Sequence, residues 1–232
     1  MPDLPRELMA IDRPPIVASA RPPMLVLLHG PGSDESELAE VEAQLDGRFH
    51  VVSVRAPFPH RPGWSWFPTT VARDGCTHVD EEPAGDVRDL LGGAIRTWVA
   101  RFGTDPWRTY LMGFSQGAGA ALHAAVTVPG CAAGAVVLSG RLVGMIEFEE
   151  SAAADGLPVF VAHGTYDPVI PVEQGRAIRK FLEIRSMRVD YREYPGGHEV
   201  TPETLADAAA WLSRRLDEGG WGKWDDEITP RG

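Results

Sequence analysis

Three residues far apart in the sequence, Ser115, Asp167 and His198, are of the types that together make a reactive hydroxyl. A free serine hydroxyl is a poor nucleophile at neutral pH, so it needs a base that takes its proton. A carboxylate then holds the imidazole base in the right tautomer and stabilises its charged form. We therefore expect His198 to accept the Ser115 proton and Asp167 to orient His198.

The serine lies in Gly113-Phe114-Ser115-Gln116-Gly117, which matches the G-x-S-x-G pattern of a sharp strand-to-helix turn. The two glycines allow the backbone to approach closely on either side of the strained serine. In such a turn the N–H of Gln116 is a candidate donor to an oxyanion. Two other interpretations stay open, a chance match and a glycine-rich turn that cradles a phosphate. The G-x-G-x-x-G dinucleotide pattern is not met here.

Other residues compete for the same roles. His29 and His163 each precede a glycine after a predicted strand, and we expect both to fix loops by hydrogen bonds. His163 precedes the acid and so reverses the order Ser, Asp, His. A structural Asp167 in a turn, or a metal site made by His163, Asp167 and His198, is conceivable. No helical His-x-x-x-His or Cys pair supports a metal, so we expect none. Rival acids that do not directly follow a predicted strand are Asp155 and Asp190.

Segments of strand and helix character alternate through almost the whole chain, which is typical of a mostly parallel sheet with helices on both faces. We expect one α/β domain over residues 1–232. The carboxyl ends of parallel strands meet at one edge, so the three residues above should lie together there. The expected strands cover residues 16–20, 24–28, 51–54, 109–112, 135–138, 158–162 and 189–194. The expected helices cover residues 35–45, 86–102, 118–126 and 172–184, with a last helix capped by Thr201 and reaching Leu216. An irregular arm is expected over residues 1–14, and the tail 217–232 is left unassigned.

The chain is acidic, with 22 Lys and Arg against 33 Asp and Glu and a formal net charge of −11. Such a charge repels polyanions, so we expect no nucleic-acid partner. No apolar stretch approaches the length of about 18 residues that spans a membrane, and the N-terminus lacks the apolar region of a signal peptide. We therefore expect a cytoplasmic protein without stable membrane association. Cys76 and Cys131 fit free thiols in a reducing compartment.

Residues 56–83 are the least regular part of the sequence, broken by prolines and carrying a cluster of aromatic side chains. A connection of this length inside a compact domain is usually functional or disordered, and the aromatic residues argue against disorder. They either pack as a small satellite core or line a pocket, and both can hold for different rings. The expected walls of a substrate pocket are Trp64, Trp66, Phe67, Leu142, Val143 and Val169.

Short motifs fall in one order over residues 24–216: Leu28-His29-Gly30-x-Gly32, Arg55-Ala56-Pro57, Trp66-Phe67, the serine turn, Leu138-Ser139-Gly140, His163-Gly164-x-x-Asp167 and Gly197-His198. Together they resemble the phospholipase/carboxylesterase family of α/β-hydrolases, which includes acyl-protein thioesterases and bacterial serine carboxylesterases. The combination is far more specific than any one motif. The resemblance implies the α/β-hydrolase fold, with Ser115 as nucleophile, Asp167 as acid and His198 as base. It also implies hydrolysis of carboxyl esters or thioesters without a cofactor.

The resemblance further implies two oxyanion donors, the amide of Gln116 and the amide of the residue after His29-Gly30. That residue is Pro31, which has no N–H to donate. Loss of one donor costs a factor of about 10²–10³ in rate. We expect Gly32 to supply the second N–H, since glycine reaches backbone angles closed to other residues. A substituting side chain and a weak activity are the alternatives.

The sequence therefore predicts a serine hydrolase that cleaves carboxyl esters with small to medium acyl chains through an acyl-enzyme. Its partner would be a small-molecule ester or thioester substrate. An acyl thioesterase or lysophospholipase of the same fold is the nearest alternative. A binding protein on a hydrolase scaffold, with Pro31 as a sign of lost catalysis, is the alternative from another class. A homodimer through an exposed apolar face is compatible with the sequence.

Overall fold

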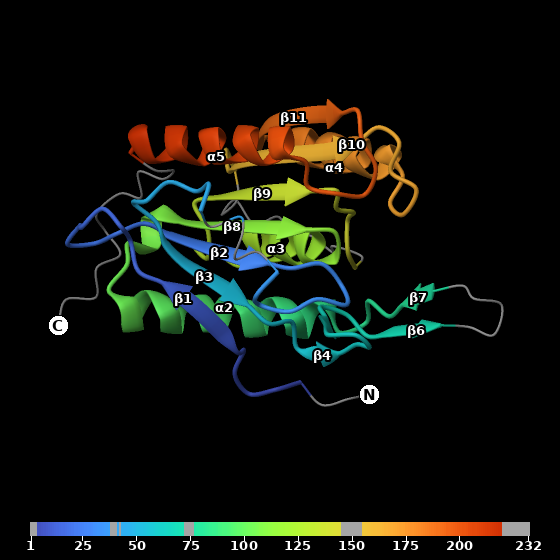
Figure 1. Cartoon of the computed structure of the whole chain (residues 1–232), viewed down its shortest axis with the longest axis horizontal. Helices are drawn as coiled ribbons and strands as arrows, with labels where there is room; N and C mark the ends of the chain where they lie inside the picture. The colour runs from blue at the N-terminus through green and yellow to red at the C-terminus, as the bar shows by residue number, and fades with distance from the viewer. Residues whose placement is uncertain (1–3, 38–40, 42, 72–76, 145–154, 220–232) are drawn as a thin grey trace.

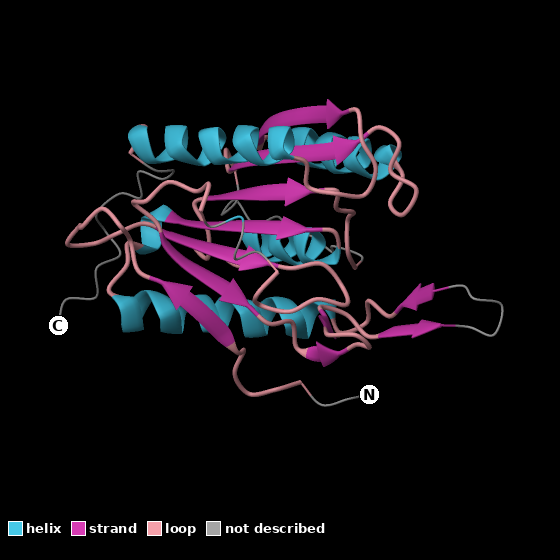
Figure 2. Cartoon of the chain, in the orientation of Figure 1, coloured by secondary structure: helices cyan, strands magenta, loops and turns pink. Residues whose placement is uncertain are grey.

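A seven-stranded sheet runs through the molecule, in the order β1-β3-β2-β8-β9-β10-β11 (Figures 1 and 2). The computed structural model describes residues 4–37, 41, 43–71, 77–144 and 155–219. Neighbouring strands of the sheet are parallel except for β1, which pairs with β3 in the antiparallel sense at one edge. The strands are β1 (Ala10–Arg13), β2 (Met24–Leu28), β3 (His50–Val54), β8 (Thr109–Phe114), β9 (Gly134–Leu138), β10 (Pro158–Gly164) and β11 (Arg188–Tyr194). The prediction of a mostly parallel sheet is confirmed.

Helices cover both faces of this sheet, as the alternation of side chains along β2 requires. Met24, Val26 and Leu28 pack into one core, which also contains residues of α2, α3 and α4. Leu25 and Leu27 pack into the other, against the apolar side of α5. Because both faces are covered, the central strands are continuous apolar runs. The helices are α2 (Ala84–Phe102), α3 (Gln116–Thr127), α4 (Val172–Ile184) and α5 (Pro202–Asp217).

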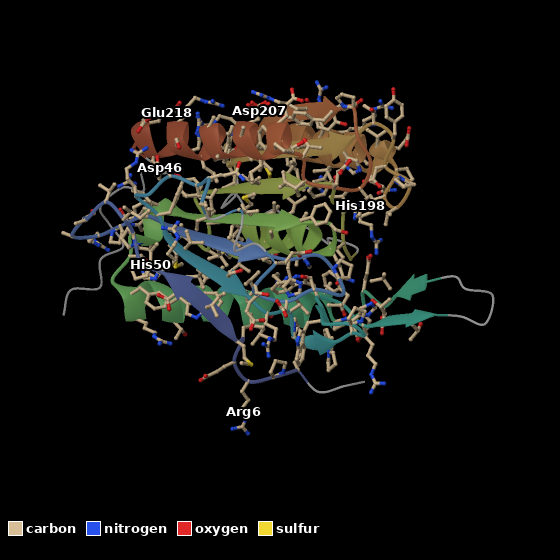
Figure 3. All side chains as sticks on the ribbon, in the orientation of Figure 1. Arg6, Asp46, His50, His198, Asp207 and Glu218 are labelled. Atoms are coloured by element: carbon tan, nitrogen blue, oxygen red, sulfur yellow. The ribbon has the colours of Figure 1, made fainter. Side chains whose placement is uncertain are left out.

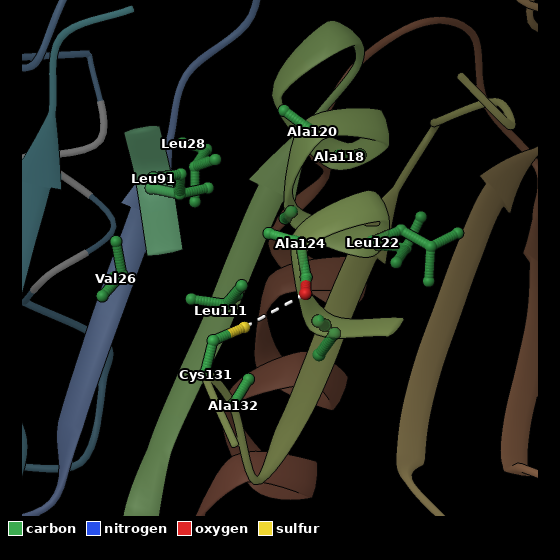
Figure 4. Packing of buried hydrophobic residues seen from close by; sticks show 14 of the residues in the cluster. Val26, Leu28, Leu91, Leu111, Ala118, Ala120, Leu122, Ala124, Cys131 and Ala132 are labelled. Atoms are coloured by element: carbon green, nitrogen blue, oxygen red, sulfur yellow. Dashed lines mark hydrogen bonds between the residues drawn. The ribbon is translucent and has the colours of Figure 1, made fainter. Parts of the chain in front are cut away.

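The alanine-rich helix α3 lies close against the central strands, where small side chains let the two backbones approach (Figure 4). Ala118, Ala120 and Ala124 are all buried in the first core. The free thiol of Cys131 donates a hydrogen bond to the carbonyl of Ala124 at 3.1 Å, and burial raises the pKa of this thiol to about 12. Cys131 is therefore a packing residue, while Cys76 lies outside the described residues.

The predictions for the N-terminal segment are wrong. The edge strand is β1 at Ala10–Arg13, inside the expected irregular arm, and residues 16–20 form no strand. Ile16 is 80% exposed, and its amide donates to the Gly47 carbonyl rather than to a strand. An antiparallel edge strand needs only one covered face and a few residues, so its sequence carries little periodicity.

The connection from β3 to α2 is more regular than the sequence predicts. It contains two small antiparallel pairs, β4 (Phe58–Pro59) with β5 (Trp64–Ser65) and β6 (Thr69–Val71) with β7 (Thr77–Val79). The helix expected over residues 35–45 cannot be followed throughout, because residues 38–40 and 42 lie outside the described range, and residues 35–37 form turns.

The carboxyl ends of the parallel strands meet at one edge of the sheet, where His198 lies (Figure 3). His50, at the start of β3, marks the opposite edge in the same view. Thr201 caps α5 as expected, since its hydroxyl accepts the Thr204 amide at 3.1 Å. Among the described helices, none has the length and apolar character that a membrane crossing requires.

Candidate active site

Ser115 occupies the sharp turn between β8 and α3. Its backbone has φ 55° and ψ −118°, a conformation that costs energy in a residue with a side chain. A Cβ on Gly113 would collide with the Gly117 carbonyl, and one on Gly117 would collide with the Leu28 carbonyl. The turn is also pinned by the Ser115 amide, which donates to the Leu138 carbonyl at 2.9 Å. The two glycines are therefore required by close backbone contacts.

The structure brings Ser115, His198 and Asp167 into one hydrogen-bonded chain. Nδ1 of His198 lies 2.7 Å from Oδ2 of Asp167, and Nε2 lies 2.8 Å from the Ser115 hydroxyl. A carboxylate only accepts hydrogen bonds, so Nδ1 carries the proton and donates it to Asp167. Nε2 is then the acceptor for the Ser115 hydroxyl. Asp167 follows β10 and His198 follows β11, so both reach the site from the carboxyl ends of adjacent strands.

The carboxylate of Asp167 is held on both of its oxygens. Oδ1 accepts the amides of Val169 at 2.9 Å and Ile170 at 2.8 Å, while Oδ2 faces His198. Burial disfavours the charged form, but the hydrogen bonds from His198, Ile170 and Val169 outweigh it and hold the pKa of Asp167 below its ordinary value. Asp167 is thus an ionised acceptor facing the imidazole.

The two His-Gly histidines support loops beside this chain of residues. Nε2 of the buried His163 donates to the Ile170 carbonyl at 2.8 Å and lies 3.5 Å from Oδ2 of Asp167. Helix α4 packs on the same ring, since a Cβ on Gly175 would lie 2.7 Å from Nδ1 of His163. His29 accepts the Ala56 amide at 3.1 Å, and burial lowers its pKa. Both histidines therefore hold loops beside the site through hydrogen bonds to the main chain.

Gln116 begins α3, so its amide is among those at the helix N-terminus that lack an intrahelical partner. Its side-chain oxygen accepts the amide of Trp66 at 2.6 Å and that of Phe67 at 3.3 Å. The residue beside the serine therefore also fixes the aromatic loop. No pattern in the sequence indicates this second role, because it depends on contact between two segments about fifty positions apart.

Gly32 does not face the site in the way the sequence predicts. Its φ is 85°, as a glycine allows, but its N–H donates to the Trp64 carbonyl at 2.8 Å. The Trp64 amide in turn donates to the Ser33 carbonyl at 2.8 Å. The Gly32 N–H is therefore already engaged in a hydrogen bond with the Trp64 carbonyl, and the prediction that Gly32 supplies the second oxyanion donor is wrong. Pro31, with no N–H of its own, remains beside Ser115 in the cleft.

An open cleft of about 810 Å³ is lined by Ser115 and Gln116. Of the predicted wall residues, Val169 lines it and is 64% exposed. Its remaining lining residues are Pro31, His60, Thr69, Val79, Glu81, Arg141, Ile170, Pro171 and Gln174. A volume of this size accommodates a small-molecule ligand.

The other predicted wall residues do not line this cleft. Trp66 and Phe67 have no exposed surface, and the Trp66 indole N–H donates a hydrogen bond to the His29 carbonyl at 2.9 Å. Val143 is buried in the first core, where it touches Gly119 of α3. Trp64 and Leu142 are half-buried and pack against the same core. Trp66 and Phe67 are therefore part of the core itself, and the pocket prediction is wrong for Trp64, Trp66, Phe67, Leu142 and Val143.

In the described part of the chain, no group of three or more His, Cys, Asp or Glu side chains could hold a metal ion.

The sequence profile of the Phospholipase/Carboxylesterase family matches residues 13–216. The chain belongs to this family. The resemblance drawn from the motifs is thereby confirmed, and the chain is a hydrolase of the phospholipase/carboxylesterase class.

Relatives named as a carboxylesterase and an acyl-protein thioesterase align over most of the chain. A probable carboxylesterase of Oryza sativa subsp. japonica is 29% identical over 211 residues, covering 83% of this chain and 88% of the relative. Acyl-protein thioesterase 1 of Kluyveromyces lactis is 28% identical over 220 residues, covering 87% of this chain and 96% of the relative. The crystal structure of the Bacillus cereus carboxylesterase superposes with a TM-score of 0.76 at 22% identity, covering 89% of this chain and 94% of that one. The α/β-hydrolase fold is thus confirmed.

Proposed function

We propose that this family member cleaves carboxyl esters of small to medium acyl chain length, with Ser115, His198 and Asp167 as its catalytic triad. The observation that carries the proposal is the hydrogen-bonded chain from Asp167 through His198 to the Ser115 hydroxyl. The open cleft above Ser115 supports a substrate of small-molecule size. The strained backbone of Ser115 also supports this proposal, because such strain is found mainly at functional sites, where the surrounding structure holds a side chain in a required position.

The proposed reaction has two halves that share one intermediate. The Ser115 oxygen attacks the acyl carbon while its proton passes to Nε2 of His198. The bond from the acyl carbon to the leaving oxygen breaks, and that oxygen takes the proton from His198. Water then gives a proton to His198 and attacks the acyl carbon; the bond from this carbon to the Ser115 oxygen breaks, and that oxygen takes the proton from His198, which releases the acid and restores the hydroxyl. Asp167 stays ionised and stabilises the transient imidazolium. The Gln116 amide is the proposed oxyanion donor.

A thioesterase is the second candidate, favoured by the alignment with nearly the full length of Acyl-protein thioesterase 1 from Kluyveromyces lactis. Its chemistry would use the same acyl-enzyme, and only the leaving atom would change from oxygen to sulfur. A matched oxyester and thioester with the same acyl chain separates the two, by the ratio of their kcat/KM values. With a net charge of −11, a nucleic-acid partner is not part of this proposal.

Stoichiometric labelling by a fluorophosphonate tests the proposed mechanism. The probe should modify one residue per chain, because only a serine activated by its own base displaces the fluoride. Peptide mapping should place the label on Ser115, and prior labelling should remove ester hydrolysis in the same proportion. Absence of modification under conditions that label a known serine esterase would indicate an inert binding protein on this scaffold.

Acidification is expected to lower the activity. Protonated His198 cannot accept the Ser115 proton, so the reaction requires the neutral imidazole, and the activity is measured over the range of about pH 5 to 8. The Asp167 carboxyl has its pKa below the ordinary value and so stays ionised across that range. The kcat/KM for p-nitrophenyl acetate, corrected for spontaneous hydrolysis, should therefore rise with pH to a plateau. A flat profile over the same range would rule out His198 as the base.

A further inference from the structure

One fixed cation lies in the described lining of the cleft that holds Ser115. Arg141 lines this cleft together with Glu81, and the other described lining residues are apolar, neutral or histidine. The chain as a whole carries 33 acidic against 22 basic side chains. A guanidinium in the wall of the cleft is therefore a local positive charge on an acidic protein.

The backbone that carries Arg141 is held rigidly on α3, the helix that begins beside Ser115. Gly140 packs so closely that a Cβ there would lie 2.7 Å from the Cβ of Ala118. A Cβ on Gly119 would lie 3.1 Å from the Arg141 carbonyl and collide with the Val143 side chain. Because the segment after β9 cannot move away from α3 without opening these contacts, the position of Arg141 relative to Ser115 is fixed by packing.

The side chain of Arg141 makes one ion pair within the described part of the chain, with Glu81. Nη2 lies 2.5 Å from Oε1 of Glu81, and Oε2 of Glu81 accepts the Gly144 amide at 2.7 Å. Oε2 of Glu81 is thus hydrogen-bonded to the main chain, while Oε1 faces the guanidinium as its ion-pair partner. A guanidinium has five N–H donors, and Glu81 is the one charged partner of Arg141 in the described part of the chain. The Arg141 side chain is 36% exposed, so its remaining donors are accessible to a ligand in the cleft.

We propose that Arg141 binds an anionic group of the substrate, so that the preferred esters carry a carboxylate or phosphate in addition to the scissile bond. This inference rests on the proposed ester hydrolysis at Ser115. A guanidinium recognises the planar, paired oxygens of a carboxylate or phosphate through parallel N–H bonds, which lysine cannot reproduce. Glu81 orients the guanidinium and leaves its other side to the substrate. Thr69 and Gln174 add neutral hydrogen-bonding groups to the same wall.

Two matched substrate pairs test the inference and separate the two ends of the ester. Mono-p-nitrophenyl adipate against p-nitrophenyl hexanoate places the negative charge on the acyl side. Acetyl glycerol phosphate against monoacetin places it on the leaving-group side. The measured quantity is the ratio of kcat/KM for the anionic ester to that for its neutral partner, with spontaneous hydrolysis subtracted. An effect in either pair supports the inference and identifies the end that Arg141 contacts.

Opposite changes are expected from two substitutions in the ion pair. Arg141→Gln should lower the anionic-to-neutral ratio by about tenfold in at least one pair, because a charge-assisted bond is lost. Glu81→Gln should raise the same ratio, because it removes the competing charge and still offers an oxygen to the Gly144 amide. Arg141→Lys should give an intermediate ratio. Circular dichroism checks that each variant folds.

Ratios that stay within about twofold of the parent for both Arg141→Gln and Glu81→Gln would overturn the inference, since this is far below the effect of a charge-assisted bond. In that case Ser115-dependent hydrolysis of the neutral esters would still stand. If the parent protein hydrolyses none of these esters in a Ser115-dependent manner, the proposed function itself fails, and the inference fails with it. The neutral esters therefore distinguish the two failures.

Discussion

Ser115→Ala is expected to lose ester hydrolysis by a factor of roughly 10⁴–10⁶ while keeping its fold, as for removal of other serine nucleophiles. Ser115 is only 4% exposed and its side chain makes no capping hydrogen bond to α3. Alanine meets the same backbone strain at φ 55° that serine already bears. The substitution therefore removes the oxygen that faces His198 and leaves the packing of the turn almost unchanged.

Hydrolysis of p-nitrophenyl acetate and butyrate, followed with thermal unfolding of the same samples, measures this effect. Ser139→Ala is the matched control. Ser139 is also a buried serine at the end of a strand, with φ 46°, and its amide donates to the Ala162 carbonyl at 2.8 Å. The control should keep most of its activity. Undiminished turnover by Ser115→Ala would refute the acyl-enzyme mechanism.

Pro31→Ala is expected to raise kcat, by up to about 10²–10³ if the new amide donates fully to the oxyanion. Pro31 lies in the cleft with Ser115 and has no N–H, and the Gly32 N–H is consumed by the Trp64 carbonyl. The family resemblance implies a second oxyanion donor at the position after His29-Gly30, which Pro31 occupies. Alanine restores an N–H there, and the main chain around it is already fixed by the Ser33 to Trp64 bridge.

The gain should appear in kcat, because an oxyanion donor acts on the transition state more than on substrate binding. Pro171→Ala is the matched control, since Pro171 lines the same cleft at the start of α4 and also gains an N–H. It should leave kcat close to that of the parent. An unchanged kcat in Pro31→Ala would mean that the restored amide points away from the reacting carbonyl.

Elements with strong periodicity or a distinctive turn were predictable from the sequence. The expected helix over residues 172–184 coincides with α4, because its apolar residues recur on one helical face. The serine turn was predictable because G-x-S-x-G is a local pattern, in which Gly113 is required by the Gly117 carbonyl four positions on. The edge strand β1 was not, since Ala10–Arg13 is short and half-buried.

The pocket walls and the second oxyanion donor depend on contacts between distant segments. From the sequence, Trp66 could either pack in a core or line a pocket. Its burial depends on hydrogen bonds to the His29 carbonyl and the Gln116 side chain. Likewise, the Gly32 amide is engaged by Trp64, thirty-two positions away. Arg141 and Glu81 carry no motif, and only the fold brings them into one cleft with Ser115.

Val169 and Ile170 hold Asp167 through their main-chain amides, while both residues line the cleft. Any residue other than proline keeps those amides, so the side chains at these two positions are free to vary without disturbing the acid. Diversification of substrate range, by evolution or by a directed library, can therefore proceed at the immediate neighbours of the proposed catalytic acid at little risk to turnover.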